Sequence, residues 1–371
     1  MRWGIARRAR ALAMTLAPLC AWQGCALIAG LEEPEPVPPG GATTGGGSGG
    51  GEGGSGAGNT GGGGSAPVDC EEPGTHLEIL AQGQVVPRGI TVDDLRVYWT
   101  TEGPDLGNNG VWMRDKAGGT PVRLADTGVR RPISLLVDST HAYWSDTSTL
   151  SCPERDGILR VSHVDTPDPS NFQILDTVCG KASMIALDTT RIYYARSGSG
   201  YVQSVPKAGG SPDDLVAAPG TAQFGIAVDD SHVYWTDQTN QQVVRASKDG
   251  TIKEDLSPAF PSPKWIGLDD EFVYWTTDNF VLKHDKVALG GDPEPLHDGL
   301  ADIVALAVDR AGDALYVIDK GTGDLLKVSK TPGVAATTIV DSGDELGGVA
   351  VDGTFVYWTN TATKEVFRAC K

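Results

Sequence analysis

The sequence predicts an all-β protein, a seven-bladed β-propeller made of four-stranded antiparallel blades. The first observation is a repeated unit, GIAVDDSHVYWTD from Gly225, in which an apolar run ends in Asp and a short turn leads into an aromatic strand. Seven copies occur, and their first aromatic residues are 45, 50, 41, 40, 42 and 41 residues apart. Repeats of this period indicate stacked supersecondary units of the length of a propeller blade.

The second observation concerns the two ends of the repeat array. The last copy stops at Val366–Lys371, after its third strand, whereas a strand-like segment, His76–Ala81, precedes the first complete copy. We expect this N-terminal segment to become the outer strand of the seventh blade and to close the ring, because closure removes exposed blade faces. A solenoid is disfavoured, since its terminal repeats need polar caps.

The fourth copy shows how one blade is organised. Its first strand, Gly225–Asp229, is apolar on both sides, as expected for a strand buried on both faces. The second, Val233–Asp237, carries neighbouring Tyr and Trp residues that point to opposite faces of the sheet. The third and fourth strands follow at Val243–Ser247 and near Ile252–Leu256. We expect the second-strand tryptophans to fill the gaps between blades, namely Trp99, Trp144, Trp235, Trp275 and Trp358.

Residues 1–25 have the pattern of an export signal. A basic start leads into an apolar stretch, Ala11–Trp22, and a small residue precedes Cys25. Gly24-Cys25 resembles a bacterial lipoprotein signal, in which the Cys is acylated and becomes the mature N-terminus, although Trp22 and Gln23 depart from the usual residues. The resemblance implies lipidation at Cys25 and sorting to the outer membrane, and a plain secretory signal is the alternative.

Residues 26–69 are expected to form a disordered tether. LEEPEPVPPG from Leu31 is rich in Pro and Glu, and Gly41–Ser65 contains 15 glycines in 25 residues. Such a composition buries too little apolar surface to offset the cost of ordering the backbone. The tether should reach on the order of 35–40 Å, which would hold a globular body at residues 70–371 away from a membrane.

The charge of the chain limits its partners. The formal net charge is −18, and without the four arginines of the N-terminal segment 26 basic residues face 48 acidic ones, a charge of −22. An acidic body repels nucleic acid and anionic lipid. We therefore expect no nucleic-acid partner and a membrane contact only through a lipid anchor. We also expect a monomer.

Four cysteines follow the N-terminal segment, and four allow three pairings. Cys370 ends the third strand of the seventh blade, and Cys70 lies just before the strand that should pair with it. Cys152 and Cys179 both lie in connections that emerge on one face of the second blade. We therefore predict the disulfides Cys70–Cys370 and Cys152–Cys179, which an exported context permits. Reduced structural thiols are the alternative.

The second strands read YWTT, YWSD, YYAR, YWTD, YWTT, YVID and YWTN. With the preceding G(I/L)xVD strand, they resemble the YWTD propellers of the low-density-lipoprotein-receptor family and related NHL-type propellers, over residues 76–371. That family uses six blades rather than seven, so its ligand binding is not transferred to any residue here. The resemblance implies that the Thr-Asp pair, here Thr236 and Asp237, hydrogen-bonds within and between blades.

An Asp follows the first strand in every copy. One interpretation is a ring of carboxylates at one mouth of the channel that holds a divalent cation. The other is that each Asp caps the tight turn to the second strand, which better explains its presence in all copies. These residues are Asp93, Asp138, Asp188, Asp229, Asp269, Asp309 and Asp352.

Few other residues indicate chemistry. The six histidines form no HxH or HExxH motif, and no GxSxG elbow, phosphate loop or CxxC occurs, so no cofactor is identified. Irregular loops on the face opposite the conserved turns are the candidate binding surface. The residues singled out there are Glu102, Arg130, Arg131, Trp265 and His297. The two arginines could contact an anion or could be ordinary solvated side chains.

Two classes of function remain. The favoured prediction is an exported, lipid-anchored binding scaffold that contacts a protein or glycan at the cell envelope. The alternative is a propeller enzyme, streptogramin-lyase-like or lactonase-like, which would need His and acidic residues converging at the centre of the loop face. The adjacent residues His297 and Asp298 are the only His–acid neighbours there. Fold alone does not decide between the two classes.

Overall fold

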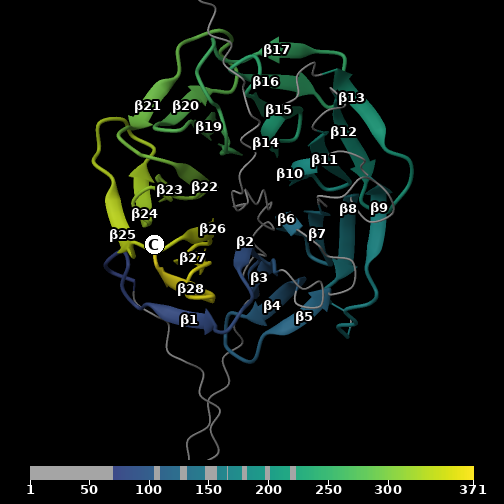
Figure 1. Ribbon diagram of the computed structural model, residues 1–371. Helices are drawn as coiled ribbons and strands as arrows, with labels where there is room; N and C mark the ends of the chain where they lie inside the picture. The colour runs from purple at the N-terminus through teal and green to yellow at the C-terminus, as the bar shows by residue number, and fades with distance from the viewer. Residues whose placement is uncertain are drawn as a thin grey trace, which may run out of the picture.

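The computed structural model describes residues 70–103, 109–125, 132–146, 157–164, 166–177, 182–196, 201–217 and 223–371. These residues form strands and no helix, so none of them belongs to a helix able to cross a membrane. The strands make seven four-stranded antiparallel sheets arranged around a common centre, as Figure 1 shows. The predicted seven-bladed β-propeller is therefore confirmed. The predicted signal segment, tether and Cys25 lie outside the described residues.

The first six blades each contain four consecutive strands, ordered from the centre outward. Blade 1 has β2 (Pro87–Val92), β3 (Arg96–Thr101), β4 (Gly110–Asp115) and β5 (Val122–Ala125). Blade 2 has β6 (Pro132–Val137), β7 (His141–Asp146), β8 (Gly157–Ser162) and β9 (Gln173–Thr177). Blade 3 has β10 (Ala182–Leu187), β11 (Arg191–Arg196), β12 (Tyr201–Pro206) and β13 (Asp213–Ala217).

The next blades follow the same order. Blade 4 has β14 (Gln223–Val228), β15 (His232–Asp237), β16 (Gln242–Ser247) and β17 (Lys253–Asp255). Blade 5 has β18 (Ile266–Leu268), β19 (Phe272–Thr276), β20 (Val281–Asp285) and β21 (Glu294–His297). Blade 6 has β22 (Ile303–Val308), β23 (Ala314–Asp319), β24 (Asp324–Ser329) and β25 (Thr337–Asp341).

Blade 7 combines strands from both ends of the sequence. It contains β26 (Leu346–Val351), β27 (Phe355–Asn360) and β28 (Glu365–Cys370), with β1 (Glu78–Ala81) outside them. β1 runs antiparallel to β28, and the two lie side by side in Figure 1 although they are at opposite ends of the chain. Arg368 of β28 donates to Glu78 of β1 at 2.8 Å, so an ion pair joins the two strands as well as their backbones.

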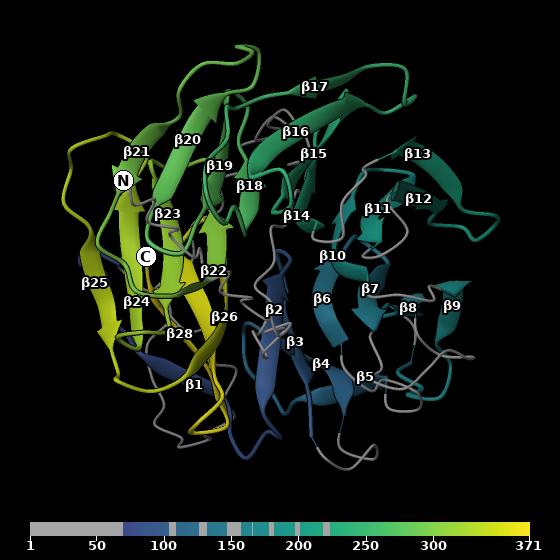
Figure 2. The same cartoon turned by 45° about the horizontal axis from the view of Figure 1, so that its top comes forward.

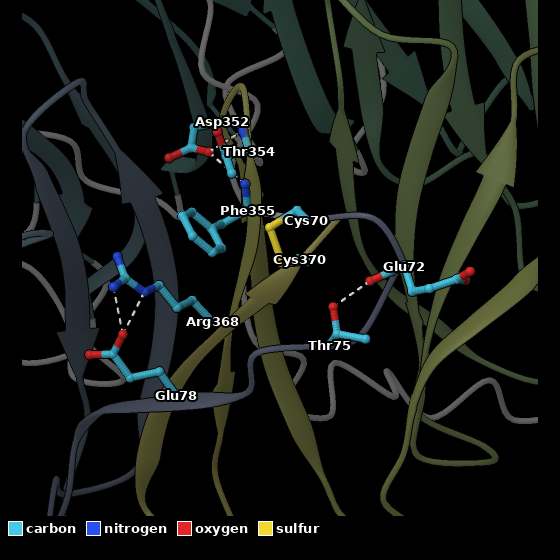
Figure 3. Close-up of a disulfide and its surroundings, with 9 residues drawn as sticks. All are labelled: Cys70, Glu72, Thr75, Glu78, Asp352, Thr354, Phe355, Arg368 and Cys370. Atoms are coloured by element: carbon cyan, nitrogen blue, oxygen red, sulfur yellow. Dashed lines mark hydrogen bonds and ion pairs between the residues drawn. A yellow bond between two sulfur atoms is a disulfide. The ribbon is translucent and has the colours of Figure 1, made fainter. Parts of the chain in front are cut away.

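The predicted Cys70–Cys370 disulfide is confirmed. The two Cα atoms are 5.3 Å apart, and the bond links the residue at the start of the described chain to the end of β28 (Figure 3). Backbone hydrogen bonds flank it, because the Cys370 N–H donates to the Thr75 carbonyl and the Gly74 N–H donates to the Cys370 carbonyl. The N-terminal connection is thus attached to β28 independently of β1. Cys152 and Cys179 lie outside the described residues.

The core lies between the blades. Tyr234 packs with Ile266 and Trp275 of blade 5, whereas its neighbour Trp235 packs in a different cluster that includes Met184 of blade 3. The adjacent Tyr and Trp of the second strand therefore fill the gaps on either side of their own blade, as their alternation predicts. The five predicted tryptophans are all buried. Large aromatic side chains that bury on both faces of a sheet supply much of the apolar area that holds such blades together.

Candidate functional site

The ring has two faces that differ in their residues. We call the side with the turns between the first and second strands the turn face. The opposite side, where the inner strands begin and the connections between blades pass, is the mouth face. Figure 2 shows the inner strands β2, β6, β14 and β22 around the centre of the ring.

Each conserved Asp caps a turn on the turn face. In blade 4, Asp229 Oδ1 accepts the N–H groups of Ser231 and His232 at 2.9 and 2.8 Å, and Oδ2 accepts the Tyr234 hydroxyl at 2.9 Å. Asp93, Asp138, Asp188, Asp269 and Asp352 make the same three contacts in their own blades. Asp309 caps a longer turn through the Gly312 N–H.

A lysine from the next blade completes most of these sites. Lys286, which follows the third strand of blade 5, places its ammonium 3.1 Å from Asp229 Oδ2 of blade 4. The same interblade ion pair occurs at Lys116–Asp352, Lys207–Asp138, Lys248–Asp188, Lys330–Asp269 and Lys371–Asp309. We call these contacts the Asp–Lys seams. The sequence analysis did not predict these ion pairs, although a Lys follows the third strand in six of the seven copies.

The interface between blades 1 and 2 departs from this pattern. His163 occupies the place of the lysine and is buried. Its Nε2 lies 2.8 Å from the Asp138 carbonyl oxygen, and its Nδ1 lies 3.1 Å from the hydroxyl of Tyr98, which itself donates to Asp93. Arg96 donates to the His163 carbonyl at 2.9 Å. The Arg96 side chain also pairs with Asp115 at 2.9 Å, so at this interface a buried histidine held by hydrogen bonds stands where a lysine ion pair occurs elsewhere.

The electrostatics of the seams fit a structural role. Burial opposes the charged form of Asp229, but two backbone N–H groups, Lys286 and Tyr234 outweigh it, so the pKa of this carboxyl is well below its usual range. Burial and the neighbouring carboxylate raise the pKa of Tyr234. Asp229 is thus charged at neutral pH, with its oxygens occupied by protein donors. Among the described residues, no group of three or more His, Cys, Asp or Glu side chains is arranged to hold a metal ion.

The mouth face joins neighbouring blades through buried threonines. Thr236 Oγ1 accepts the Gly225 N–H at 2.8 Å and donates to the Lys264 carbonyl of the next blade at 2.7 Å. Thr359 of blade 7 makes the equivalent contacts with Gly348 and with the Arg88 carbonyl of blade 1. Asp237 accepts the N–H groups of Thr239 and Asn240. The Thr-Asp pair therefore bonds within and between blades.

Charged side chains gather beside these threonines. Arg88 Nε lies 2.8 Å from Glu102 Oε2. Lys264, which is buried, places its ammonium 2.8 Å from Asp278 and 3.2 Å from Asp302. Burial of Asp278 is outweighed by its contacts with Lys264, so the pKa of this carboxyl is lowered. This part of the mouth face thus holds two cations, one in an inner strand and one just before an inner strand, each paired with at least one carboxylate.

The residues singled out from the sequence have different positions in the structure. Glu102 lies on the mouth face and pairs with Arg88. His297 ends the outermost strand β21, opposite Val281, and so lies away from the inner strands. Arg130 and Arg131 lie outside the described residues.

The interpretation of Trp265 as a surface binding residue is wrong. Its side chain is 0% exposed, and its ring meets Phe224 edge to face with centroids 5.0 Å apart. Its Nε1–H donates to the Ile303 carbonyl of blade 6 at 3.2 Å. Trp265 therefore packs between blades rather than facing a partner. The sequence held a signal for this: the residue four positions before the repeat Asp is also buried at Ser134, Met184 and Ala305.

No histidine lies beside the paired charges of the mouth face. His141 and His232 follow turn-face aspartates, and His163 and His284 end at the same face, where they bond to backbone carbonyls. His76 lies next to Thr75, which bonds to Cys370. With His297 on an outer strand, all six histidines of the sequence are accounted for among the described residues.

No protein-family model matches the sequence. Among solved structures, a streptogramin B lyase is 14% identical with a TM-score of 0.62, over 79% of this chain and 96% of that chain. A catalytically inactive virginiamycin B lyase from Staphylococcus aureus with quinupristin is 15% identical with a TM-score of 0.64, over 80% and 99%. A nidogen/laminin complex gives 16% identity and a TM-score of 0.50, over 74% and 97%. At these identities the likeness concerns the fold alone, and the chain is a β-propeller.

Proposed function

We propose that this chain is an exported, lipid-anchored binding scaffold, and that its mouth face contacts a protein or glycan at the cell envelope. The observation that carries the proposal is the set of charged side chains on the mouth face, Arg88 with Glu102 and Lys264 with Asp278 and Asp302. Arg88 lies in the inner strand β2 and Lys264 lies just before the inner strand β18, and the backbone carbonyl of each accepts an interblade hydrogen bond from a threonine. Rigid presentation of charged groups lowers the ordering cost of binding and supplies electrostatic complementarity to a partner.

Export is supported by two independent features. The Cys70–Cys370 disulfide suits an oxidising compartment, since such bonds rarely persist in the cytosol. The N-terminal Gly24-Cys25 pattern supplies a candidate lipid attachment site and address. We further propose that the repeats are YWTD-like units adapted to seven blades, with the Thr-Asp pair used for blade packing.

A propeller enzyme of the streptogramin-lyase-like or lactonase-like kind remains the alternative. Acid–base catalysis by histidine requires the imidazole to lie within hydrogen-bond reach of the reacting group. The six histidines lie on the turn face, near the disulfide or on an outer strand, away from the charged residues of the mouth. This arrangement favours binding over histidine-dependent catalysis.

Two measurements test the proposal. Metabolic labelling with a radioactive fatty acid should mark the full chain and fail to mark Cys25→Ser. A photo-crosslinking amino acid at Ala362, an exposed residue of the mouth face, should capture a discrete partner in intact cells, whereas the same group at Leu95, an exposed turn-face residue, should not. Equal capture from both positions would contradict binding by the mouth face, and labelling of the Ser variant would contradict lipidation at Cys25.

A further inference from the structure

A groove of about 560 Å³ lies where blade 7 meets blade 1. Its lining includes Ile79 and Gln82 on one side, and Trp112 and Pro121 on the other. Ile79 belongs to the outermost strand β1 and is 42% exposed. Trp112 is half-buried, and its indole N–H donates to Thr101, which fixes the ring in place. The groove therefore offers a rigid aromatic ring and an exposed aliphatic side chain to an extended peptide.

The charge around this groove is unlike that of the rest of the protein. Among the described strands, β5 is the only outermost strand of a blade without an acidic residue, and it carries Arg123 instead. The Arg123 guanidinium lies over the Trp112 ring, 5.5 Å from its centroid. Lys364 is exposed and adjoins the other end of the groove, because its carbonyl accepts the Gln84 N–H at 2.9 Å. The one acidic residue of β1, Glu78, is paired with Arg114 and Arg368, so an overall acidic protein carries a cation over an aromatic ring at this groove.

We propose that this groove binds the chain's own acidic, proline-rich segment, residues 32–39, EEPEPVPP. Proline-rich segments enter the polyproline II conformation at low entropic cost and bind aromatic-lined grooves. The three glutamates of the segment complement Arg123, which lies over Trp112, and Lys364, whose backbone meets Gln84 of the groove. Four prolines remove backbone donors, so a surface of aromatic and aliphatic side chains suits the segment better than a sheet edge does.

The length of the connecting chain allows this contact. Thirty residues, 40–69, separate the segment from Cys70, and a Gly-rich chain of that length spans roughly 30 Å on average. Cys70 is fixed by its disulfide to Cys370, and only nine residues along the chain separate it from Ile79, at most about 30 Å when extended. A linker whose average span is similar to the distance between Cys70 and the groove gives an effective concentration in the millimolar range. A low affinity of the groove for the segment is therefore sufficient for occupancy.

The consequence is a tether that folds back on the blade 7–1 seam. Docking would shorten the free tether to its Gly-rich part and cover Trp112. This inference is independent of the proposed partner on the mouth face and of lipidation, because both members of the contact belong to this chain.

The test uses the full chain with a photo-crosslinking amino acid at Val37, and a matched control at Thr60 in the Gly-rich part. Position 60 is closer to Cys70, so without specific docking it should crosslink to the seam at least as well as position 37. We expect position 37 to crosslink within the same chain to residues 78–84 or 110–123, and position 60 to give no preferred site. The same map from both positions would overturn the proposal.

Charge reversal supplies the second arm. The double variant Glu33→Arg/Glu35→Arg changes residues that are not part of the propeller, so the packing of the propeller is kept. Loss of the crosslink in this variant would therefore report lost docking rather than misfolding. Adding Arg123→Glu should restore the crosslink. A crosslink unaffected by the reversal would refute the charge argument. Crosslinks that form only between two chains, and vanish on dilution, would assign the groove to a second copy and would also overturn the intramolecular proposal.

Discussion

Replacing Lys330 by Met should destabilise the ring by breaking one Asp–Lys seam without altering any turn. Lys330 Nζ lies 2.8 Å from Asp269 Oδ2, and the two side chains are only 14% and 12% exposed. The variant leaves the Asp269 carboxylate in place, still held by Tyr274 and by the Phe272 N–H, but without its cation. Methionine keeps most of the aliphatic volume, so the change reports the charge.

The magnitude follows from the burial of the pair. Exposed ion pairs contribute about 0–1 kcal/mol, whereas removing one partner of a fully buried pair costs about 3–5 kcal/mol. A pair with about an eighth of each side chain exposed lies between these limits and is partly screened by solvent. We expect a loss of about 2 kcal/mol in the free energy of unfolding, or about 4 °C in melting temperature for a chain of this size.

The assay is urea and thermal unfolding at pH 7, with Lys327→Met as the matched control. Lys327 lies in β24, the strand that Lys330 follows, and makes no ion pair among the described residues, so its replacement removes the same charge with little loss of stability. A double-mutant cycle with Asp269→Asn should give a coupling energy of about 1–2 kcal/mol. Equal stability of the Lys330→Met and Lys327→Met variants, or a coupling energy near zero, would refute the reasoning.

The pH dependence of the same variant gives an independent check. Burial of Asp269 favours its neutral form, but Lys330, Tyr274 and Phe272 outweigh it, so its pKa lies below the ordinary value of 3.8. A lowered pKa in the folded state contributes stability that is complete above about pH 4 and is lost as the pH falls through the folded-state value. The difference between wild type and Lys330→Met should therefore be full at pH 7 and shrink below pH 4.

Three further variants test the disulfide and the threonine contacts between blades. Cys70→Ser should lower stability by about 2–4 kcal/mol under oxidising conditions, since the disulfide closes a loop across 300 residues of sequence, and the difference from wild type should disappear in reductant; an unchanged melting temperature would contradict this role. Thr359→Val should cost about 1–2 kcal/mol, because the Gly348 N–H and the Arg88 carbonyl lose a buried partner. Thr236→Val should lower the free energy of unfolding by the same amount at the interface of blades 4 and 5. Unchanged stability of either variant would show that these hydrogen bonds do not contribute to stability.

The fold could be predicted from the sequence because each repeat contains the residues that form its turn and its contacts with neighbouring blades. An Asp at the end of the first strand, five residues before a Tyr, already predicts a capped turn, and Asp229 with Tyr234 shows that contact. The partner lysine was not predicted, although Lys286 stands at the same place as five other lysines. Its role depends on the contact between the end of the third strand and a turn of the preceding blade. That contact exists only in the assembled ring and cannot be seen from the sequence of one blade.

The sequence was less informative about the site because surface residues and residues buried between blades are only a few positions apart in the chain. Trp265 follows an irregular connection, which suggested an exposed side chain. Its ring instead packs against Phe224 of the preceding blade. Glu102 was placed on the correct face, but its partner Arg88 was not identified. Arg88 lies in an inner strand, where a charged residue is not expected from the apolar repeat.

The position five residues before the repeat Asp explains how one repeat can serve both structure and binding. At this position the backbone carbonyl accepts the threonine of the preceding blade, as at Arg88 and Lys264. The seam thus uses only the main chain there, so the side chain is free to vary. It does vary, through Ile133, Ser183, Phe224, Val304 and Gly347 in the other copies. Arg88 and Lys264 are the two cations at this position, and both pair with carboxylates of the mouth face, so variation here changes the chemistry of that face while the threonine hydrogen bond is kept.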